Sequence, residues 1–162
     1  YITVDSEVGK GSCFELYLPL SDETLQHVAT ERAKSVPVVS GKILLVDDEK
    51  LILDVGSKTL TDAGYDVTCF SRSDDAIEFF KSHSEEVSMI VLDMIMPGKS
   101  GLEAWHAFRK IDPEVKVIIS SGYSVKGDAQ QVLNEGGKEF LQKPFRLDVL
   151  KDTVAKVLSD AD

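Results

Sequence analysis

Cysteine is scarce in this sequence, and the two that occur, Cys13 and Cys69, lie far apart. Neither has a CxxC partner or a histidine at metal-ligand spacing, so neither a zinc site nor a disulfide framework is indicated. Long apolar runs are also missing, because no stretch approaches the roughly 20 residues that span a bilayer. The first residues lack the basic and apolar regions of a signal peptide. We therefore expect a cytoplasmic location and no membrane contact for this part of the protein, and a membrane anchor elsewhere in the parent protein stays open.

Basic residues are outnumbered as well. The 162 residues include 18 Lys and Arg against 28 Asp and Glu, a net charge of −10. This balance argues against a nucleic-acid or anionic-membrane partner and suits a site that gathers divalent cations. The length allows one well-buried domain and little more. Because the chain begins at Tyr1 rather than at Met, we expect it to be a piece of a longer protein.

Residues 1 to 20 predict a small β-hairpin, since two short alternating stretches flank a loop around Gly9-Lys10-Gly11. The loop is not a Walker A loop, because the spaced first glycine is missing and Gly11 follows the lysine where that motif has Ser or Thr. Residues 6 to 19 resemble the last glycine-rich turn and closing strand of the ATP-binding domain of sensor histidine kinases. The resemblance implies a remnant of that domain in residues 1 to 20, and a plain hairpin is the alternative. Residues 21 to 41 are polar, lack a sustained apolar face, and are predicted to be a linker.

From Lys42 onward, strand and helix patterns alternate regularly. Five short apolar runs predict strands, and five stretches with apolar residues three or four apart predict helices. The strands are expected at 43–46, 67–70, 89–92, 115–120 and 139–142, and the helices at 49–63, 72–83, 100–111, 125–135 and 147–159. Ser73-Asp74-Asp75 is typical of a helix start. The pattern predicts an α/β domain with a doubly wound, five-stranded parallel sheet between two layers of helices.

The third apolar run ends on a carboxylate, Asp93, which stands between Leu92 and Met94. A carboxylate in such a place loses hydration unless a cation, a hydrogen-bond donor or a covalent partner compensates it. Its position indicates chemistry, and the alternative is an aspartate that only caps the turn after the strand.

In a parallel sheet the carboxyl ends of the strands share one edge, where ligands bind. The polar residues at these ends are Asp47, Asp48, Asp93, Ser120, Ser121 and Lys143. Three adjacent carboxylates repel one another unless a cation lies among them, and Mg²⁺ prefers such oxygen ligands. With Mg²⁺ bound, Asp93 could attack a phosphoryl group while the ion neutralises the developing charge. Lys143 and a serine hydroxyl would complete the phosphoryl clamp.

Residues 42 to 160 resemble the receiver domain of two-component response regulators. The motifs that carry the resemblance are Asp47-Asp48, Asp93 with Met96-Pro97-Gly98, Ser121-Gly122, and Lys143-Pro144-Phe145. The resemblance implies a flavodoxin-like (βα)₅ fold. It also implies that the domain accepts a phosphoryl group from a histidine. It also implies that the chain is the C-terminal part of a hybrid sensor histidine kinase.

The resemblance assigns the metal and phosphoryl roles residue by residue. It makes Asp93 the phosphoacceptor and a Mg²⁺ ligand, Asp48 a direct Mg²⁺ ligand, and Asp47 a partner that acts through metal-bound water. It gives a further metal position to the backbone carbonyl of Ile95. It also implies that Lys143 contacts the phosphoryl oxygens and that its peptide bond to Pro144 is cis.

Two further positions match the switch residues of the family. Ser121 matches the switch hydroxyl because it directly precedes Gly122, and Ser120 is the weaker choice. Phe140, three residues before Lys143, matches an aromatic that rotates inward on activation, and the alternative is an ordinary strand residue.

Phosphoryl lifetime in the family depends on the residues two positions beyond the acceptor and two beyond the switch hydroxyl. Here these residues are Ile95 and Tyr123. Ile95 has no polar atom to hold a hydrolytic water and Tyr123 is bulky. We therefore expect slow self-hydrolysis of the aspartyl phosphate.

The first predicted helix bears on the phosphodonor. Its spacing predicts a core face of Ile52, Val55, Thr59, Leu60 and Ala63. That face would leave Leu51 and Leu53 exposed beside the acidic edge. The two leucines would suit docking of a phosphodonor helix, and the alternative is that they are ordinary surface leucines.

The expected partners are the dimerisation and phosphotransfer domain of a histidine kinase or a separate histidine phosphotransfer protein. Phosphorylation-dependent dimerisation is a further expectation. The enzyme status stays open, because the chain lacks a complete kinase domain and a receiver catalyses only its own phosphorylation and dephosphorylation.

Two alternatives compete with a phosphorylated receiver. A haloacid-dehalogenase-type phosphatase needs a second aspartate two residues beyond the first, where this chain has Ile95. A receiver-fold module that binds proteins without phosphorylation tends to lose the acidic pair or the lysine, and both are present.

Overall fold

The computed structural model describes residues 1–18, 41–122 and 127–160. The chain divides into two compact units, Tyr1–Ser35 and Val36–Asp162. Most of the predicted linker and the lifetime residue Tyr123 lie outside the described residues. Among the described residues, no helix has both the length and the apolar character needed to cross a bilayer.

The first unit contains the predicted hairpin. Strands β1 (Ile2–Glu7) and β2 (Gly11–Leu16) pair antiparallel. Val4 faces Phe14 and Ile2 faces Leu16, so the apolar side chains share one face of the ribbon. Gly9 in the turn has a φ of 80° and Gly11 at the start of β2 has a φ of 107°, a backbone region that favours glycine.

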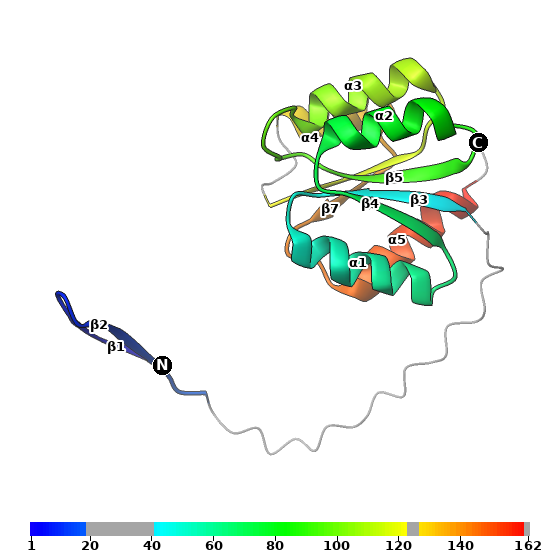
Figure 1. Cartoon of the computed structure of the whole chain (residues 1–162). Helices are drawn as coiled ribbons and strands as arrows, with labels where there is room; N and C mark the ends of the chain where they lie inside the picture. Colours follow the sequence, from blue (N-terminus) through cyan, green and yellow to red (C-terminus); the bar gives the residue numbers. More distant parts are fainter. Residues whose placement is uncertain (19–40, 123–126, 161–162) are drawn as a thin grey trace. The chain divides into compact units, whose positions relative to one another are not determined.

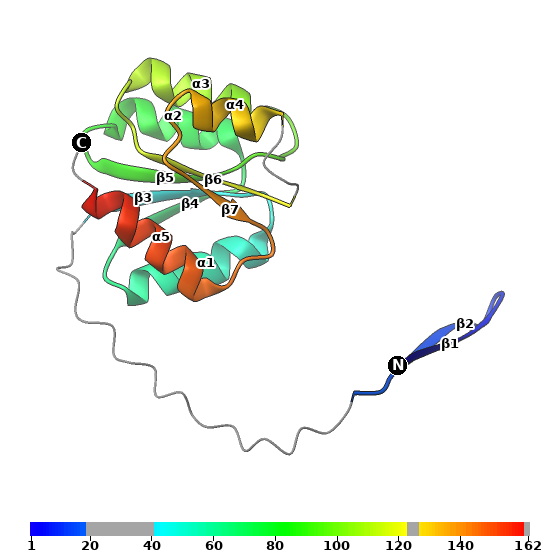
Figure 2. The ribbon, with the colours of Figure 1, turned by 180° about the vertical axis from the view of Figure 1, so that it is seen from behind.

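The second unit is a five-stranded parallel sheet with five helices, as predicted (Figures 1 and 2). The strands are β3 (Lys42–Val46), β4 (Asp66–Phe70), β5 (Val87–Asp93), β6 (Val117–Ser121) and β7 (Glu139–Gln142), and the helices are α1 (Lys50–Asp62), α2 (Ser73–His83), α3 (Gly101–Ile111), α4 (Asp128–Asn134) and α5 (Leu147–Ser159). The strand order is β4-β3-β5-β6-β7. The direction of the winding therefore reverses beside β3 and β5, which makes their carboxyl ends the expected ligand edge.

Helices α1 and α5 cover one face of the sheet, and α2, α3 and α4 cover the other (Figures 1 and 2). Alternate residues of β3 therefore enter different cores: Ile43 and Leu45 pack toward α1 and α5, and Leu44 and Val46 pack toward the other layer. Burial of both faces explains why this strand reads as a continuous apolar run.

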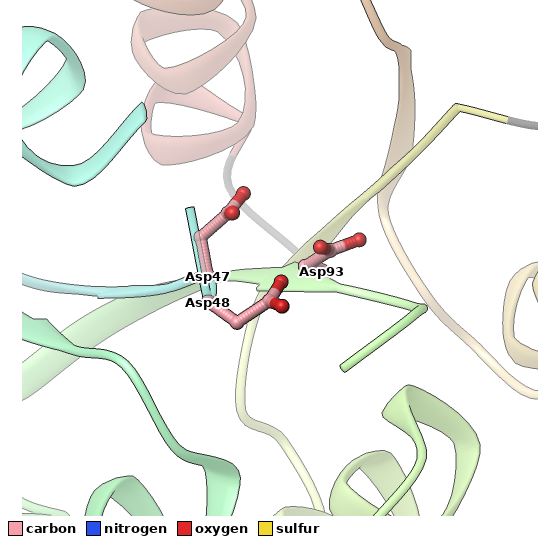
Figure 3. A group of neighbouring side chains, drawn as sticks. All are labelled: Asp47, Asp48 and Asp93. Carbon is pink, nitrogen blue, oxygen red and sulfur yellow. The ribbon is translucent and has the colours of Figure 1, made fainter. Parts of the chain in front are cut away.

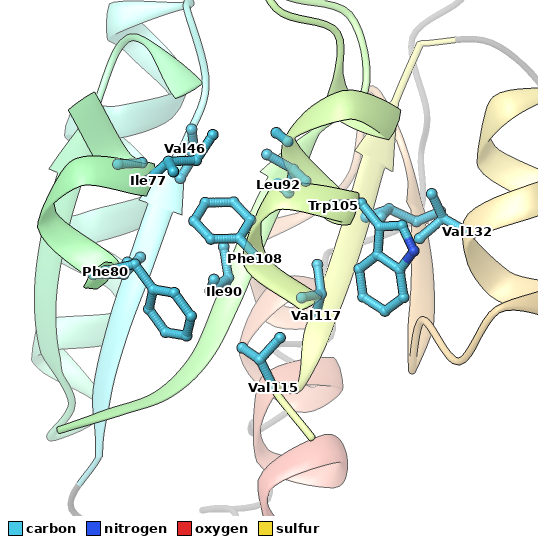
Figure 4. Packing of buried hydrophobic residues seen from close by; sticks show 14 of the residues in the cluster. Val46, Ile77, Phe80, Ile90, Leu92, Trp105, Phe108, Val115, Val117 and Val132 are labelled. Carbon is cyan, nitrogen blue, oxygen red and sulfur yellow. The ribbon is translucent and has the colours of Figure 1, made fainter. Parts of the chain in front are cut away.

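Aromatic packing fills the larger of the two cores (Figure 4). Phe80 of α2 meets Phe108 of α3 edge to face, with ring centroids 5.4 Å apart. Trp105 is fully buried beside them, and its indole N–H donates to Glu135, directly after α4, at 3.0 Å. The packing holds α2, α3 and α4 together over β5 and β6.

The predicted core face of α1 is wrong by about one residue. Leu53, predicted to be exposed, is only 9% exposed and packs with Leu60, whereas Val55, predicted to be buried, is 37% exposed. Gly56 explains the rotation, because a Cβ at this position would lie 3.0 Å from Cδ2 of Leu45. Helix α1 approaches β3 through its glycine, and a count of apolar spacings cannot detect that contact. Leu51 is exposed, as predicted.

Candidate functional site

Three carboxylates meet where β3 and β5 end. Asp93 is the last residue of β5, and Asp47 and Asp48 directly follow β3 (Figure 3). One carboxylate oxygen from each lies within 4.8 Å of the others. Asp47 is 1% and Asp93 is 4% exposed, while Asp48 faces solvent. The adjacent parallel pairing of β3 and β5 produces this cluster, as the sequence predicts.

Lys143 reaches the same cluster from the end of β7. Its Nζ lies 2.7 Å from Oδ2 of Asp47, 3.0 Å from Oδ2 of Asp93 and 3.3 Å from Oε1 of Glu49. Its peptide bond to Pro144 is cis, which confirms that prediction. Its backbone N–H donates to the carbonyl of Ser121 at 2.8 Å, which extends the pairing of β6 with β7 and fixes where the side chain starts.

The electrostatics of the cluster follow from burial and these contacts. Burial raises the pKa of Asp47, an effect that the hydrogen bond from Lys143 opposes. Burial alone would lower the pKa of Lys143, but hydrogen bonds to Asp47 and Asp93 outweigh it and raise that pKa above its usual value. Lys143 is therefore a permanent cation at neutral pH.

Backbone N–H groups hold the remaining carboxylate oxygens. The N–H of Glu49 donates to Oδ1 of Asp47 at 3.0 Å, and the N–H of Ile95 donates to Oδ1 of Asp93 at 3.2 Å. Each buried aspartate thus has one oxygen on a backbone N–H and the other on Lys143. The loops on both sides of the cluster fix the orientation of the two carboxylates before any ligand binds.

The predicted switch residues occupy the neighbouring strands. Ser121 ends β6 and is buried, and Ser120, which pairs with Asp93 in the sheet register, is buried as well. Phe140 of β7 is half-buried and packs against the core on the side of α2, α3 and α4.

An open hollow of about 520 Å³ lies over the cluster. It is lined by Asp48, Glu49, Ile52, Asp93, Ile95, Gly122, Lys143, Pro144 and Phe145. The sequence did not indicate Glu49 or Ile52 at this site. A third acid directly after Asp47-Asp48 was the available signal for Glu49, and Ile52 had been assigned to the core.

The residues fit a hard divalent cation. Asp47, Asp48 and Asp93 offer oxygens within 4.8 Å of one another, and Lys143 contacts only two of these three carboxylates, Asp47 and Asp93. All of the offered ligand atoms are oxygens, and the adjoining hollow leaves room for retained water. Mg²⁺ has these preferences.

A doubly wound parallel sheet with an acidic trio and a lysine at its carboxyl edge defines the receiver class of α/β domains. The chain belongs to the response regulator receiver domain family, whose model matches residues 43–155. The predictions of family and fold are therefore confirmed.

The comparison with curated proteins includes a sensor kinase. Over 170 aligned residues the chain is 34% identical to the sensor kinase CckA of Brucella abortus (strain 2308). The alignment covers 100% of this chain but 18% of that protein, so the chain spans less than a fifth of the relative's length.

Solved receiver domains share the fold. The chain is 30% identical to a receiver domain protein from Clostridium thermocellum, with a TM-score of 0.69, covering 73% of this chain and 94% of that one. It is 29% identical to the BeF3-activated receiver domain of DrrB from Thermotoga maritima, with a TM-score of 0.64, covering 75% and 99%.

Proposed function

We propose that residues 42–160 form a phosphoacceptor receiver that takes a phosphoryl group from a histidine onto Asp93 with Mg²⁺. The carrying observation is the placement of Asp93: its Oδ2 lies 3.0 Å from the Lys143 ammonium, and its carboxylate lines the open hollow. The carboxylate is held in place and is reachable from the hollow, as a nucleophile must be.

The transfer is a direct displacement at phosphorus. An O–P bond forms to a carboxylate oxygen of Asp93 as the P–N bond to the donor histidine breaks, and the electron pair of that bond stays on the imidazole nitrogen. Positioning and charge stabilisation supply most of the acceleration in such reactions. Lys143 offers its ammonium to the transferred oxygens, and the Ser121 hydroxyl supplies a further donor from the end of β6.

Asp48, Asp93 and the carbonyl of Ile95 would hold Mg²⁺, with Asp47 acting through water. When bound, the ion neutralises negative charge on the transferred oxygens. The support from this chain is the oxygen-only donor set within 4.8 Å and the match to a family whose members bind Mg²⁺ in general.

The proposed lifetime of the phosphoryl group depends on the side chain of Ile95, which lies at the rim of the hollow. The side chain of Ile95 is 52% exposed there and offers no polar atom to orient a water. Slow self-hydrolysis of the aspartyl phosphate is therefore part of the proposal, with Tyr123 as the second contributor.

The proposed parent is a hybrid sensor histidine kinase, with residues 1–20 as the end of its ATP-binding domain, 21–41 as a linker and 42–160 as the receiver. Alignment with a sensor kinase over the whole of this chain supports this order. The phosphodonor is then the histidine of the kinase dimerisation domain or of a phosphotransfer protein. Because such kinases draw the phosphoryl group from ATP, we place the receiver in the cytoplasm.

Beryllofluoride, a mimic of an aspartyl phosphate, provides the test. With Mg²⁺ present, ¹⁹F NMR of the chain should show bound fluoride, and Asp93→Asn should abolish the signal. Asp62→Asn, at an exposed site at the end of α1, is the matched control and should retain it. Absence of binding to the folded wild-type chain would favour the receiver-fold module that works without phosphorylation.

A further inference from the structure

The loop between β5 and α3, residues 94–100, carries both the carbonyl and the side chain of Ile95. Met94 and Met96 are buried in the core, and Ile95 between them points outward. At the start of the loop, the N–H of Gly101 donates to the carbonyl of Met94 at 3.1 Å. The conformation of this short segment therefore determines what Ile95 presents beside Asp93.

Ser73, at the start of α2, holds the far end of this loop. Its hydroxyl donates to the backbone carbonyl of Lys99 at 3.2 Å, across 26 residues of sequence. Ser73 is 2% exposed. The sequence suggests a helix-capping serine here, but the N-cap position of α2 is Arg72 and no side chain caps that helix end. The Ser73 hydroxyl therefore holds the 94–100 loop and does not cap α2.

The next residue of α2 holds the same lysine by its side chain. Oδ1 of Asp74 lies 2.8 Å from Nζ of Lys99, and the hydrogen bond from Lys99 lowers the pKa of the Asp74 carboxyl. The pair is partly exposed, so its own contribution to stability is small. Its geometric effect is larger, because two consecutive residues of α2 fix both the backbone and the side chain of one loop residue.

We propose that Ser73 and Asp74 are positioning residues for the acceptor site, holding the 94–100 loop so that the Ile95 carbonyl is set for the metal. The inference rests on the proposed function. Groups outside the ligand shell determine how well ligands are oriented, and losing such a group weakens metal binding. Gly98, with a φ of 89°, lies between the two anchored ends, so the held Lys99 also limits the freedom of this glycine.

The test uses the full 162-residue chain with two variants and two matched controls. Ser73→Ala removes the loop contact, and Ser159→Ala removes a hydroxyl that donates to a carbonyl in the last turn of α5. Asp74→Asn removes the charge that pairs with Lys99, and Asp75→Asn removes the neighbouring charge, whose contact with Arg72 is 4.0 Å long. The readouts are amide hydrogen exchange of the metal-free chain and Mg²⁺ affinity by calorimetry.

Ser73→Ala should speed exchange within residues 94–100 and weaken Mg²⁺ binding by up to about fivefold, the equivalent of one neutral hydrogen bond. Asp74→Asn should change loop exchange and Mg²⁺ affinity in the same direction as Ser73→Ala, by a smaller amount. Its effect should exceed that of Asp75→Asn. Ser159→Ala should leave both readouts at their wild-type values.

Wild-type loop exchange and wild-type Mg²⁺ affinity in Ser73→Ala would overturn the inference, even if the variant were less stable. A wild-type chain that binds no Mg²⁺ would overturn the proposed function instead. In that case the exchange measurement still decides whether α2 holds the loop.

Discussion

Asp47 and Asp93 are nearly equivalent by contact, yet only one is placed to react. Each is buried, each accepts one backbone N–H, and each contacts Lys143. The difference is access, because Asp93 lines the hollow and Asp47 does not. Access to the hollow, more than charge, therefore supports Asp93 as the proposed nucleophile.

Ile95 gives a test of the proposed phosphoryl lifetime. Ile95→Asn places an amide at the rim of the hollow that can orient a water toward the phosphoryl group, so self-hydrolysis should accelerate by about tenfold or more. Loss of the phosphorylated form, followed by intact mass after removal of the donor, measures the rate. Ile95→Val keeps the apolar rim and should stay near wild type. An unchanged rate in Ile95→Asn would refute the assignment of lifetime to this position.

Sequence reasoning located the charged residues of the site because parallel strands end on one edge. That rule places Asp47, Asp93 and Lys143 together without any knowledge of side-chain direction. It could not find Ser73 or the contact of Glu49 with Lys143. Both depend on the path of side chains between elements that are distant in sequence, which periodicity does not contain.

At the scale of elements, helix α1 carries one leucine in the core, Leu53, and one on the surface, Leu51. Leu53→Ala should lower the free energy of unfolding by about 2–4 kcal/mol, because it leaves a cavity against Leu60 and its neighbours. Leu51→Ala, at a side chain that is 72% exposed, should change it by less than about 0.5 kcal/mol. Urea unfolding measures both, and equal losses would contradict the observed rotation of α1.

The same helix refines the docking prediction. Leu53 is buried, so Leu51 is the leucine of the original pair that can meet a phosphodonor, together with the exposed Ile95. The periodic pattern gave the helix and its length but not its rotation. The deciding contact is the approach of Gly56 to Leu45, and glycine contributes nothing to an apolar count.

The start of α3 is packed directly against the end of β5, the strand that ends on Asp93. A Cβ at Gly101 would lie 2.5 Å from Cα of Met94 and 2.7 Å from the carbonyl oxygen of Asp93. Both are backbone atoms that cannot move aside cheaply, so Gly101→Ala should destabilise the domain by at least about 2 kcal/mol. Thermal or urea unfolding measures the loss. Gly122→Ala meets nothing within 4 Å and is the control, and a tolerated Gly101→Ala would contradict the close contact.

At the scale of the whole molecule, folding should be linked to Mg²⁺. An ion held by Asp48 and Asp93 binds the folded chain only, so stability should rise by about 1.4 kcal/mol for each tenfold increase in Mg²⁺ above the dissociation constant. EDTA should reverse the gain, and Asp48→Asn should remove most of it. The same gain from NaCl at equal ionic strength would assign the effect to screening of the −10 net charge.

The sequence predicted the strands, the helices and the hairpin, but not the order of the strands in the sheet. Five alternating strands and helices are typical of a parallel sheet with helical crossovers. The glycines at positions 9 and 11 are a local signal for the N-terminal hairpin. The strand order β4-β3-β5-β6-β7 is not contained in the alternation, and the prediction of a doubly wound sheet did not specify it. Hydrophobic patterns say which face is buried but not which strand lies beside which.

Phosphorylation by acetyl phosphate with Mg²⁺, read by intact mass and peptide mapping, tests the central claim most directly. The chain should gain one phosphoryl group, located on Asp93, and Asp93→Asn should gain none while staying folded. Omission of Mg²⁺ or the change Asp48→Asn should strongly reduce the gain. A folded wild-type chain that stays unmodified, or one modified at a residue other than Asp93, would contradict it.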